Sequence, residues 1–313
     1  MSSVHLIDTQ ALKAEALRLG FSAVGFSVAE PVDAGVKQAY QTWLAKGYQA
    51  DMHYLENHPD LRFNPTLLVP GAHTVISLAL CYHPGTRPTQ PAIAWYAQGR
   101  DYHDVMKQLL QQLIERFGLT GRCFCDSAPV LDRYWAWRGG LGFIGKHTQL
   151  VIPRLGSTFF LGEMIVEQEA DRYDTPLTPA YSDNLCGQCR RCLDACPTRA
   201  ISAGRPMVAE RCLSYQTIEH RGPMTEGIGK HLTPCFYGCD RCTNACPHLH
   251  APAHPIRSEL RPTEELLKMK AGDWKDLTIE QYRTLFRGSA VKRAKYEGLM
   301  RNIQAAQESN ETI

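Results

Sequence analysis

The cysteines are the residues whose chemistry is easiest to infer, because nine of the twelve lie between Cys186 and Cys246. They form two blocks of related spacing: Cys186-Gly-Gln-Cys189-Arg-Arg-Cys192-Leu-Asp-Ala-Cys196-Pro197 and Cys239-Asp-Arg-Cys242-Thr-Asn-Ala-Cys246-Pro247. The run C-x2-C-x2-C-x3-C-P is typical of ferredoxins with two clusters, in which the fourth thiolate binds the other cluster. The sequence therefore predicts two 4Fe–4S clusters.

This crossed pattern also predicts which cysteines bind which cluster. The first cluster would be bound by Cys186, Cys189, Cys192 and Cys246. The second would be bound by Cys196, Cys239, Cys242 and a fourth thiolate, for which Cys212 and Cys235 both remain candidates. A structural zinc site is the alternative, since C-x2-C pairs also suit tetrahedral zinc, but both Cys-Pro endings favour the clusters. Two neighbouring clusters form an electron path, so we expect another group beside them to be reduced.

Two segments before the cysteine blocks are polar where a packed core would not require it. One reads Tyr96-Ala-Gln-Gly-Arg-Asp101-Tyr102-His103, and the other runs from Asp126 to Thr148. Neither contains a phosphate-binding glycine motif. The second segment has glycines that would let the backbone approach a bulky ligand: Gly139, Gly140, Gly142 and Gly145. Asp126 itself suits either a helix cap or a catalytic acid.

The elements that must position these segments alternate between strands and helices. Residues 74–81 form a continuous apolar run rich in β-formers, which predicts a buried strand. Residues 104–117 have helical spacing, and residues 122–127 predict a strand that ends in a polar turn at Asp126. Further strands are predicted at 21–26, 149–153 and 158–166. The alternation predicts an α/β (α+β) fold built on a mixed sheet.

Changes in composition divide the chain into three predicted units. Residues 1–175 would form the α/β domain, residues 176–255 are rich in Cys, Pro and Gly, and residues 256–313 are charged and helical. The middle unit would be a ferredoxin-like domain that carries the two clusters.

Overall composition limits the classes of function. The chain has 313 residues, 44% hydrophobic and 21% charged, with a formal net charge of only +2, so no global field favours a polyanionic partner. A local basic face remains possible. There is no apolar run long enough to cross a bilayer, and the N-terminal segment reads as an amphipathic helix rather than a signal peptide. We therefore expect a cytoplasmic protein without a membrane partner, in which disulfides are rare and clustered cysteines indicate metal.

The chain resembles the epoxyqueuosine reductases, which are cobalamin and iron–sulfur enzymes that complete queuosine in tRNA. Besides both cysteine blocks, the resemblance rests on Met52-His-Tyr-Leu, Arg62, Gly99-Arg-Asp-Tyr-His103, Asp126-Ser-Ala-Pro-Val-Leu-Asp-Arg133, Gly140-Leu-Gly-Phe-Ile-Gly-Lys146, Arg211-Cys-Leu-Ser-Tyr215, Ile218-Glu-His-Arg-Gly222, Gly288-Ser-Ala-Val-Lys-Arg293 and Arg301-Asn302. It implies that residues 1–175 bind cobalamin. It also implies that the substrate is an epoxide on the wobble base of tRNAs with GUN anticodons, those for Tyr, His, Asp and Asn.

The resemblance also implies roles for individual residues. Asp126 would be the proton donor, and Cys212 rather than Cys235 would be the fourth ligand of the second cluster. Contacts to cobalamin would come from Arg62, Asp126, Leu150, Leu161, Ser214, Cys239 and Asp240. Contacts to tRNA would come from Arg133 and from the turn His220-Arg221-Gly222. We also expect a monomer that receives electrons from an external low-potential donor.

Several residues keep two interpretations at this point. If Asp126 is the acid, an apolar corrin face should raise its pKa and keep it protonated. Tyr102 and His103 could relay protons to the substrate or only pack against it. Trp135 and Trp137 could stack on bases or belong to the core. A basic group could bind RNA or form a solvated face: Lys230, Lys292, Arg293, Lys295 and Arg301.

The chain departs from the family pattern in two places and leaves two rival functions. Pro247 is followed by His248-Leu249 where the family often has Trp-Asn, and Thr233-Pro234-Cys235 replaces the usual Gly-Asn before the second block. The chain also ends before the helical-repeat tail of some relatives, so we expect tRNA affinity to come from the core and the short C-terminal segment. A reductive dehalogenase-like corrinoid protein is one rival, although such proteins usually carry an export signal. A ferredoxin-type electron carrier is the other, but it gives the first 180 residues no role.

Overall fold

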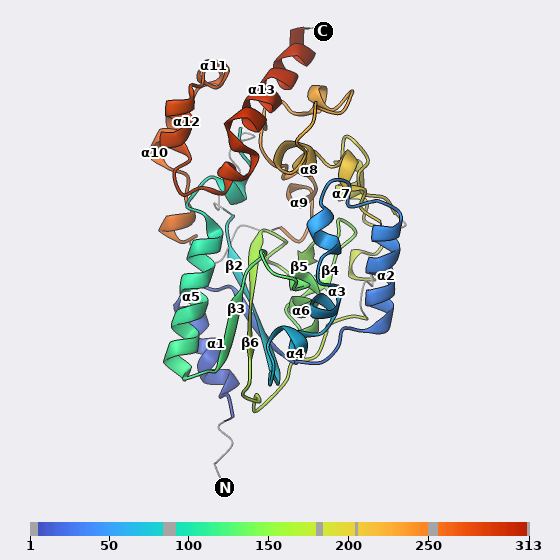
Figure 1. Ribbon diagram of the computed structural model, residues 1–313, viewed down its shortest axis with the longest axis vertical. Helices are drawn as coiled ribbons and strands as arrows, with labels where there is room; N and C mark the ends of the chain where they lie inside the picture. The colour runs from blue at the N-terminus through green and yellow to red at the C-terminus, as the bar shows by residue number, and fades with distance from the viewer. Residues whose placement is uncertain (1–5, 84–91, 180–183, 204–205, 250–255, 312–313) are drawn as a thin grey trace.

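The computed structural model describes residues 6–83, 92–179, 184–203, 206–249 and 256–311. A four-stranded sheet of order β1-β2-β6-β3 forms its centre (Figure 1), from β1 (Ala23–Val28), β2 (Thr74–Cys81), β6 (Phe159–Val166) and β3 (Gly121–Phe124). Every neighbouring pair in this sheet is antiparallel. Strand β2 lies in the interior of the sheet and is buried on both faces, which explains its continuous apolar sequence. The predicted combination of helices and sheet is confirmed, but the sheet is antiparallel throughout rather than mixed.

Helices cover both faces of this sheet (Figure 1). On one face lie α1 (Thr9–Arg18) and α5 (Tyr102–Phe117), whose buried residues pack on Phe26, Ile76 and Met164. On the other face lies α6 (Asp132–Arg138), together with α2 (Ala34–Ala45), α3 (Pro59–Phe63) and α4 (Pro65–Leu68). Trp135 and Trp137 of α6 are 1% and 5% exposed and belong to this second core. The interpretation that they stack on RNA is therefore wrong.

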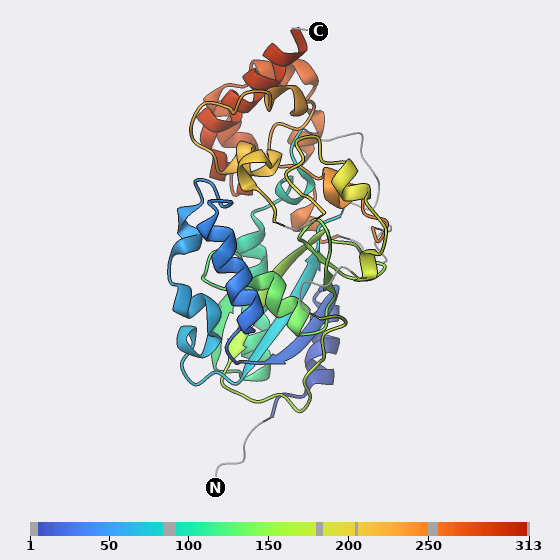
Figure 2. The ribbon, with the colours of Figure 1, turned by 90° about the vertical axis from the view of Figure 1, so that its right-hand side faces the viewer.

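The cysteine blocks and the C-terminal segment form several short helices and one long C-terminal helix at the end of the molecule farthest from the N-terminus (Figure 2). A two-stranded hairpin lies between these helices and the sheet, formed by β4 (Phe143–Ile144) and β5 (Leu150–Val151). The helices are α7 (Arg191–Asp194), α8 (Leu213–Ile218), α9 (Arg241–Asn244), α10 (Glu264–Lys268), α11 (Ala271–Lys275), α12 (Ile279–Leu285) and α13 (Lys295–Glu311). The 3-10 helices used below are η1 (His53–Glu56), η2 (Trp95–Ala97) and η7 (Ala290–Ala294).

The segment that leads into α5 passes through the core of the C-terminal helices. Ile93 pairs with Tyr237 in a parallel bridge, and both belong to a buried cluster with Trp274 and other residues of the C-terminal helices. The amide of Asp101 then donates to the carbonyl of Gly288 at 2.6 Å. The boundaries proposed at 175 and 255 therefore separate segments that share one core, and they stay a prediction.

The predicted elements differ from the observed ones at their ends. Helix α5 begins at Tyr102, two residues before the predicted start, because the side chain of Asp101 accepts from the amide of His103 and caps the helix. Strand β3 ends at Phe124, because the chain turns into a left-handed conformation at Asp126 (φ +58°).

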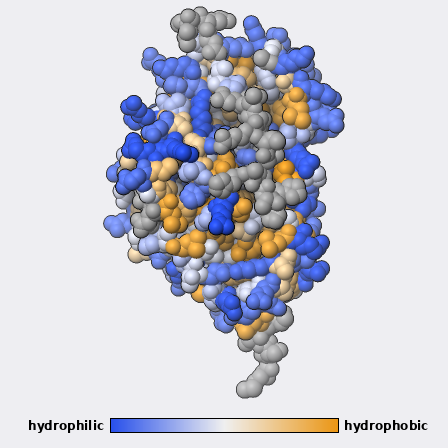
Figure 3. Space-filling model, turned by 180° about the vertical axis from the view of Figure 1, so that it is seen from behind, coloured by the Kyte–Doolittle hydropathy of each residue, from blue (hydrophilic) through white to orange (hydrophobic). Residues whose placement is uncertain are grey.

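No helix in the described part of the chain is both long and apolar enough to span a membrane. From behind, hydrophobic residues gather across the middle of the surface (Figure 3).

Candidate active site

Asp126 lies in the loop between β3 and α6, and its side chain meets the first turn of α5. Its Oδ2 atom accepts a hydrogen bond from the hydroxyl of Tyr102 at 2.5 Å. Nε2 of His103 lies 3.6 Å from the same oxygen. The Asp126 side chain is 65% exposed, so it can reach a bound substrate. The sequence left the roles of Tyr102 and His103 open, and the structure places both against this carboxylate.

A second carboxylate lies behind His103. Nδ1 of His103 is 2.7 Å from Oδ1 of Asp101, a residue that is only 4% exposed. The other oxygen of Asp101 receives Lys292 Nζ, from η7, at 2.9 Å. His103 therefore bridges a buried aspartate and an exposed one. Sequence reasoning did not single out Asp101 as a partner of His103, although its place two residues earlier as a helix cap was a usable signal.

These contacts determine which groups carry protons. Hydrogen bonding to Asp101, and then to Asp126, raises the pKa of His103 from 6.5 to about 9. Hydrogen bonding to His103 lowers the pKa of Asp126, and Tyr102 adds to this effect against the opposing effect of burial. The contacts of the chain itself therefore lower the pKa of Asp126, and the expectation that an apolar corrin face raises it stays a prediction. Near neutral pH, His103 is an imidazolium and Asp126 is a carboxylate.

Stacking fixes the ring that donates to Asp126. Tyr102 lies against Phe160 of β6 with a centroid distance of 4.3 Å and an interplanar angle of 2°. Its other neighbour is the imidazole of His103, at 4.1 Å. Burial, followed by the charge of Asp126, raises the pKa of Tyr102 well above its ordinary value. Tyr102 therefore stays a neutral hydrogen-bond donor with little rotational freedom.

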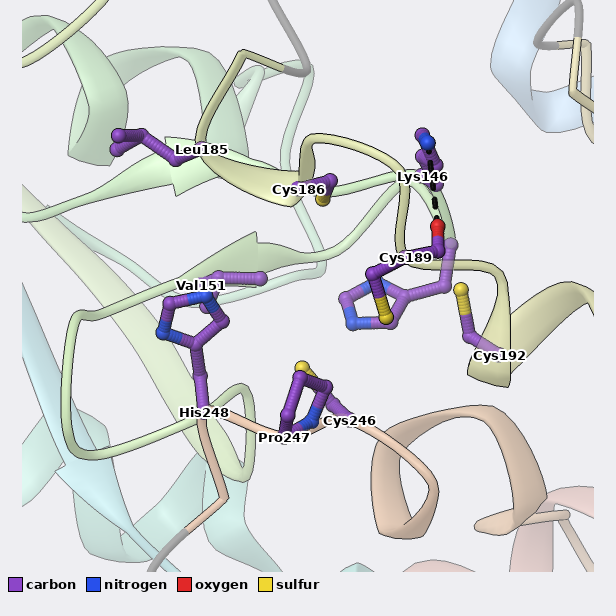
Figure 4. Close-up of a pocket in the computed structure, with 10 residues that line it drawn as sticks. Lys146, Val151, Leu185, Cys186, Cys189, Cys192, Cys246, Pro247 and His248 are labelled. Carbon is purple, nitrogen blue, oxygen red and sulfur yellow. Dashed lines mark hydrogen bonds between the residues drawn. The ribbon is translucent and has the colours of Figure 1, made fainter.

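The four cysteines assigned to the first cluster line one pocket. Cys186, Cys189, Cys192 and Cys246 point their sulfur atoms toward a common space (Figure 4). Lys146 fixes the loop of the first block, because its Nζ donates to the carbonyls of Gly187 and Cys189 at 2.6 and 3.1 Å. Among the described residues, no three His, Cys, Asp or Glu side chains converge tightly enough for a single ion. A cubane binds its thiolates at separate iron atoms and therefore spaces them more widely.

The four cysteines assigned to the second cluster also lie together. Burial, followed by the neighbouring thiols of Cys239, Cys212 and Cys196, raises the pKa of Cys242 well above its ordinary value. The thiol of Cys235 is directed elsewhere, since it donates to the carbonyls of Tyr237 and Gly238 at 3.3 and 3.5 Å. This arrangement supports the choice of Cys212 over Cys235 as the fourth ligand.

Polar atoms without partners accompany the residues implied to bind cobalamin. The buried Arg62 donates weakly to the carbonyls of Tyr54 and Asn57, and its Nε has no acceptor among the described residues. Asp240 accepts from the amide of Trp95 at 2.8 Å, and burial raises the pKa of Asp240 to about 6. The indole nitrogen of Trp95 is buried and likewise has no acceptor in the described chain. Such donors fit a corrin, whose rim carries amide oxygens.

The other implied cobalamin contacts come from separate elements. Leu150 is buried in β5, Leu161 is half-buried in β6, and Ser214 is half-buried at the start of α8. Cys239 precedes Asp240 directly and belongs to the second cysteine group. Leu150 and Leu161 thus lie on strands, whereas Ser214 and Cys239 lie in the cysteine region. Their contact with cobalamin stays a proposal.

The turn implied to contact tRNA is held in place by α13. Arg301 donates to the carbonyls of His220 and Gly222 at 2.8 and 2.7 Å. Nδ1 of His220 is 2.9 Å from Oδ2 of Asp51, while Arg221 remains exposed and donates to the carbonyl of Arg293. Arg301 therefore supports the backbone of the turn, and its guanidinium is not free for RNA.

Two further members of the predicted basic group are also engaged within the protein. Lys292 pairs with Asp101, and Arg293 pairs with Glu219 at 2.7 Å. Arg133 also donates within the protein, to the carbonyl of Thr148, but among the described residues it forms no ion pair with a carboxylate. It is exposed on α6 and lies close enough to Asp126 for its charge to contribute to the low pKa of that carboxyl. Lys230 and Lys295 are exposed as well. An RNA-binding face is therefore supported by Arg133 and Arg221 more than by the C-terminal group.

Comparisons with known proteins agree with this arrangement. A family model described as epoxyqueuosine reductase QueG, DUF1730 matches residues 62–127, and a 4Fe-4S double cluster binding domain matches residues 185–248. The chain is 39% identical to the epoxyqueuosine reductase of Cellulophaga algicola, over 93% of this chain and 95% of that protein. The QueG model, which matches residues 62–127, includes both Asp101 and Asp126. Neither comparison points to a dehalogenase or to a simple ferredoxin.

Solved structures show the same fold. The epoxyqueuosine reductase of Streptococcus thermophilus is 28% identical, with a TM-score of 0.83, covering 96% of this chain and 81% of that one. An epoxyqueuosine reductase solved with an epoxyqueuosine-modified tRNA-Tyr stem loop is 26% identical, with a TM-score of 0.82, covering 95% and 80%. Sequence and fold agree over nearly the whole chain, and this protein therefore belongs to the epoxyqueuosine reductase family.

Proposed function

We propose that this chain reduces epoxyqueuosine to queuosine at the wobble position of tRNA anticodons. The observation that carries the proposal is the exposed Asp126 carboxylate, which is bonded to Tyr102 and backed by a protonated His103. Family membership, and a relative solved with an epoxyqueuosine-modified tRNA stem loop, support the choice of substrate. The substrates would be the tRNAs with GUN anticodons, which supports a cytoplasmic location.

The reaction determines what the site must supply. Converting the epoxide to an alkene breaks two carbon–oxygen bonds, consumes two electrons and two protons, and releases water. An alkoxide is a poor leaving group, so acid assistance to the oxygen typically contributes about 10² to 10⁴-fold. The protein must therefore deliver electrons to the carbon side and protons to the oxygen side of one small ring.

The electron side would be provided by three groups that the chain binds. Cobalamin, when bound, supplies two-electron reduction of the epoxide, with electrons arriving through two 4Fe–4S clusters. Its contacts would be Arg62, Leu150, Leu161, Ser214, Cys239 and Asp240, of which Arg62 offers an unused buried donor. The clusters would be bound by the two cysteine groups described above. An external low-potential donor would reach the first cluster at its pocket, where Leu185 is 47% exposed.

The proton side follows from the positions of Asp101, His103 and Asp126. His103 is charged near neutral pH and lies within reach of Asp126, so it can pass its proton to that carboxylate. Asp126 then presents the proton to the leaving oxygen, and Tyr102 keeps the carboxyl oriented. Asp101, paired with Lys292, stays ionised and holds the imidazole ring in place throughout. Asp126 is thus the last member of a relay rather than a permanently protonated acid.

Binding of tRNA would depend on local charge, because the net charge is only +2. Arg133 is exposed beside Asp126, and the His220-Arg221-Gly222 turn is held against α13. Tyr54 of η1 is 47% exposed and close enough to Asp126, Glu219 and Arg293 for their charges to affect its pKa. We expect Arg133 and this turn to contribute to one RNA-binding surface.

One experiment tests the activity itself. The protein, reconstituted with iron, sulfide and cobalamin under anaerobic conditions, is incubated with epoxyqueuosine-containing tRNA and a strong reductant. Digestion and mass spectrometry should then show a nucleoside that has lost one oxygen atom. An unchanged nucleoside, in protein that contains both clusters and cobalamin, would refute the proposed function.

A further inference from the structure

A buried acid lies beneath the Asp126 loop and has no part in the mechanism above. Glu163 is in the middle of β6, within the apolar sequence Phe159-Phe-Leu-Gly-Glu-Met-Ile-Val166, and is 0% exposed. In the sheet its partners are Ser77 of β2 and Phe124 of β3. Among the described residues, neither carboxyl oxygen accepts a hydrogen bond from an amide, hydroxyl or basic group. An ionised carboxylate in such surroundings would be strongly destabilising.

The group that Glu163 meets is another acid. The carboxyl of Asp132, the first residue of α6, lies close enough to that of Glu163 for each to affect the pKa of the other. Two ionised carboxylates only accept hydrogen bonds, so a hydrogen bond between these two acids would require a proton on one of them. Burial, followed by the charges of Asp132 and Asp126, raises the pKa of Glu163 well above its ordinary value. The proton therefore belongs on Glu163, which can donate it in a hydrogen bond to Asp132.

Asp132 in turn contacts the backbone of the candidate acid. Its Oδ1 accepts from the amide of Asp126 at 3.4 Å. Asp126 has a φ of +58°, a left-handed conformation that is unfavourable for residues other than glycine. A contact that fixes this amide also fixes the direction of the Asp126 side chain. Glu163, Asp132 and Asp126 thus form a chain of contacts from the interior of the sheet to the surface of the site.

We propose that Glu163 is a positioning residue: as a neutral acid it donates a hydrogen bond to Asp132, which directs Asp132 at the Asp126 amide and holds Asp126 against Tyr102 and His103. The inference rests on the proposed function only for the role of Asp126. The contacts themselves do not depend on substrate. A proton shared between the two acids also keeps one negative charge, rather than two, below the Asp126 carboxylate.

The protonation of Glu163 can be observed directly by infrared spectroscopy. Reconstituted protein near neutral pH, without substrate, should show the carbonyl stretch of a neutral carboxylic acid. The Glu163→Gln variant should lack this band, because Glu163 is its source. If the wild-type protein lacks the band, or if the band persists in Glu163→Gln, the assignment of the proton is overturned.

The positioning role can be measured by hydrogen exchange of the amides in residues 125–131. Glu163→Gln keeps a donor toward Asp132, so exchange should stay close to that of the wild type. Glu163→Leu keeps the volume but removes the donor, and exchange of the Asp126 amide should be about tenfold faster, the effect of losing one hydrogen bond. The exposed Glu167 provides the matched control, since Glu167→Leu should change nothing in this loop.

These outcomes distinguish the inference from a general loss of folding. Cluster content and circular dichroism of each variant report whether the chain has folded. Exchange in Glu163→Gln that is as fast as in Glu163→Leu would refute the role of the donated hydrogen bond. Exchange as slow as in the wild type in both variants would refute it as well. Because neither measurement uses tRNA, a failure of the proposed function on its substrate would leave these results unaffected.

Discussion

Replacing Asp101 by asparagine should lower the pKa of His103 and shift the pH dependence of turnover with it. The carboxylate of Asp101 accepts from His103 Nδ1 at 2.7 Å and is the largest cause of the raised pKa. Asparagine can still cap α5 and accept from the ring, so the helix should keep its start. What the variant removes is the negative charge.

The size of the effect follows from the structure. A rise from 6.5 to about 9 corresponds to about 3 kcal/mol, since one pKa unit is worth about 1.4 kcal/mol. Asp126 contributes part of this rise, and the His103 side chain is 30% exposed, so solvent screening reduces the share of Asp101. We therefore expect Asp101→Asn to lower the pKa of His103 by about one unit.

The sign of the pH effect is fixed by the raised pKa. The stabilisation from charged His103 is fully present below pH 6.5 and is lost as the pH rises through about 9. If the imidazolium supplies the proton, turnover of the wild type should fall in the same range. In Asp101→Asn the fall should begin about one pH unit lower.

The assay is a histidine titration by NMR with isotope-labelled imidazole, in which the signal absent from His103→Gln identifies the residue. Turnover of epoxyqueuosine-containing tRNA is measured over the same pH range. A wild-type His103 that titrates near 6.5 would refute the reasoning. An unchanged His103 pKa in Asp101→Asn would show that Asp101 does not control the proton.

Other parts of the site give independent predictions. Cys212→Ala should lose one cluster, about half of the roughly eight iron atoms, whereas Cys235→Ala should keep both clusters. Iron analysis after anaerobic reconstitution measures this difference. The opposite result would exchange the roles of the two cysteines. Arg133→Ala combined with Arg221→Ala should weaken binding of the anticodon stem loop and reduce its salt dependence, while Arg283→Ala, exposed on α12, serves as the control; unchanged affinity in the double variant would place the RNA elsewhere. Tyr102→Phe should raise the pKa of Asp126, because it removes one of the bonds that lower it, and a carboxyl titration that does not move would show that this bond is unimportant.

Local patterns were sufficient to predict much of the fold. The apolar run at 74–81 forms β2 with the predicted bounds, because a strand in the interior of a sheet is apolar on both faces. The cysteine spacing predicted which side chains would gather, since short helices between the cysteines bring them together. The place of Asp126 after a strand in a polar segment singled it out, but only the family resemblance implied its role as proton donor. In each case the signal lay within a few neighbouring residues.

The partners of these residues could not be predicted, because they come from distant parts of the chain. Lys292 reaches Asp101 only because the segment before α5 packs among the C-terminal helices. In the same region Arg301 donates to the backbone of the His220 turn. From the sequence alone, Arg301 could not be distinguished from a solvated surface charge. The low pKa of Asp126 depends on His103 in another element, and the sequence did not show that these two side chains meet. A glutamate inside an apolar strand was a signal that could have revealed Glu163.

The most direct test of the central claim is the turnover of Asp126→Asn on epoxyqueuosine-containing tRNA. Asparagine preserves the shape of the side chain and can still accept from Tyr102, but it cannot carry the proton to the leaving oxygen. The variant should fold, contain both clusters and cobalamin, and turn over about 10² times more slowly than the wild type, the low end of general acid effects. Turnover near the wild-type rate in a fully loaded variant would contradict the account, because the proton would then reach the oxygen without Asp126.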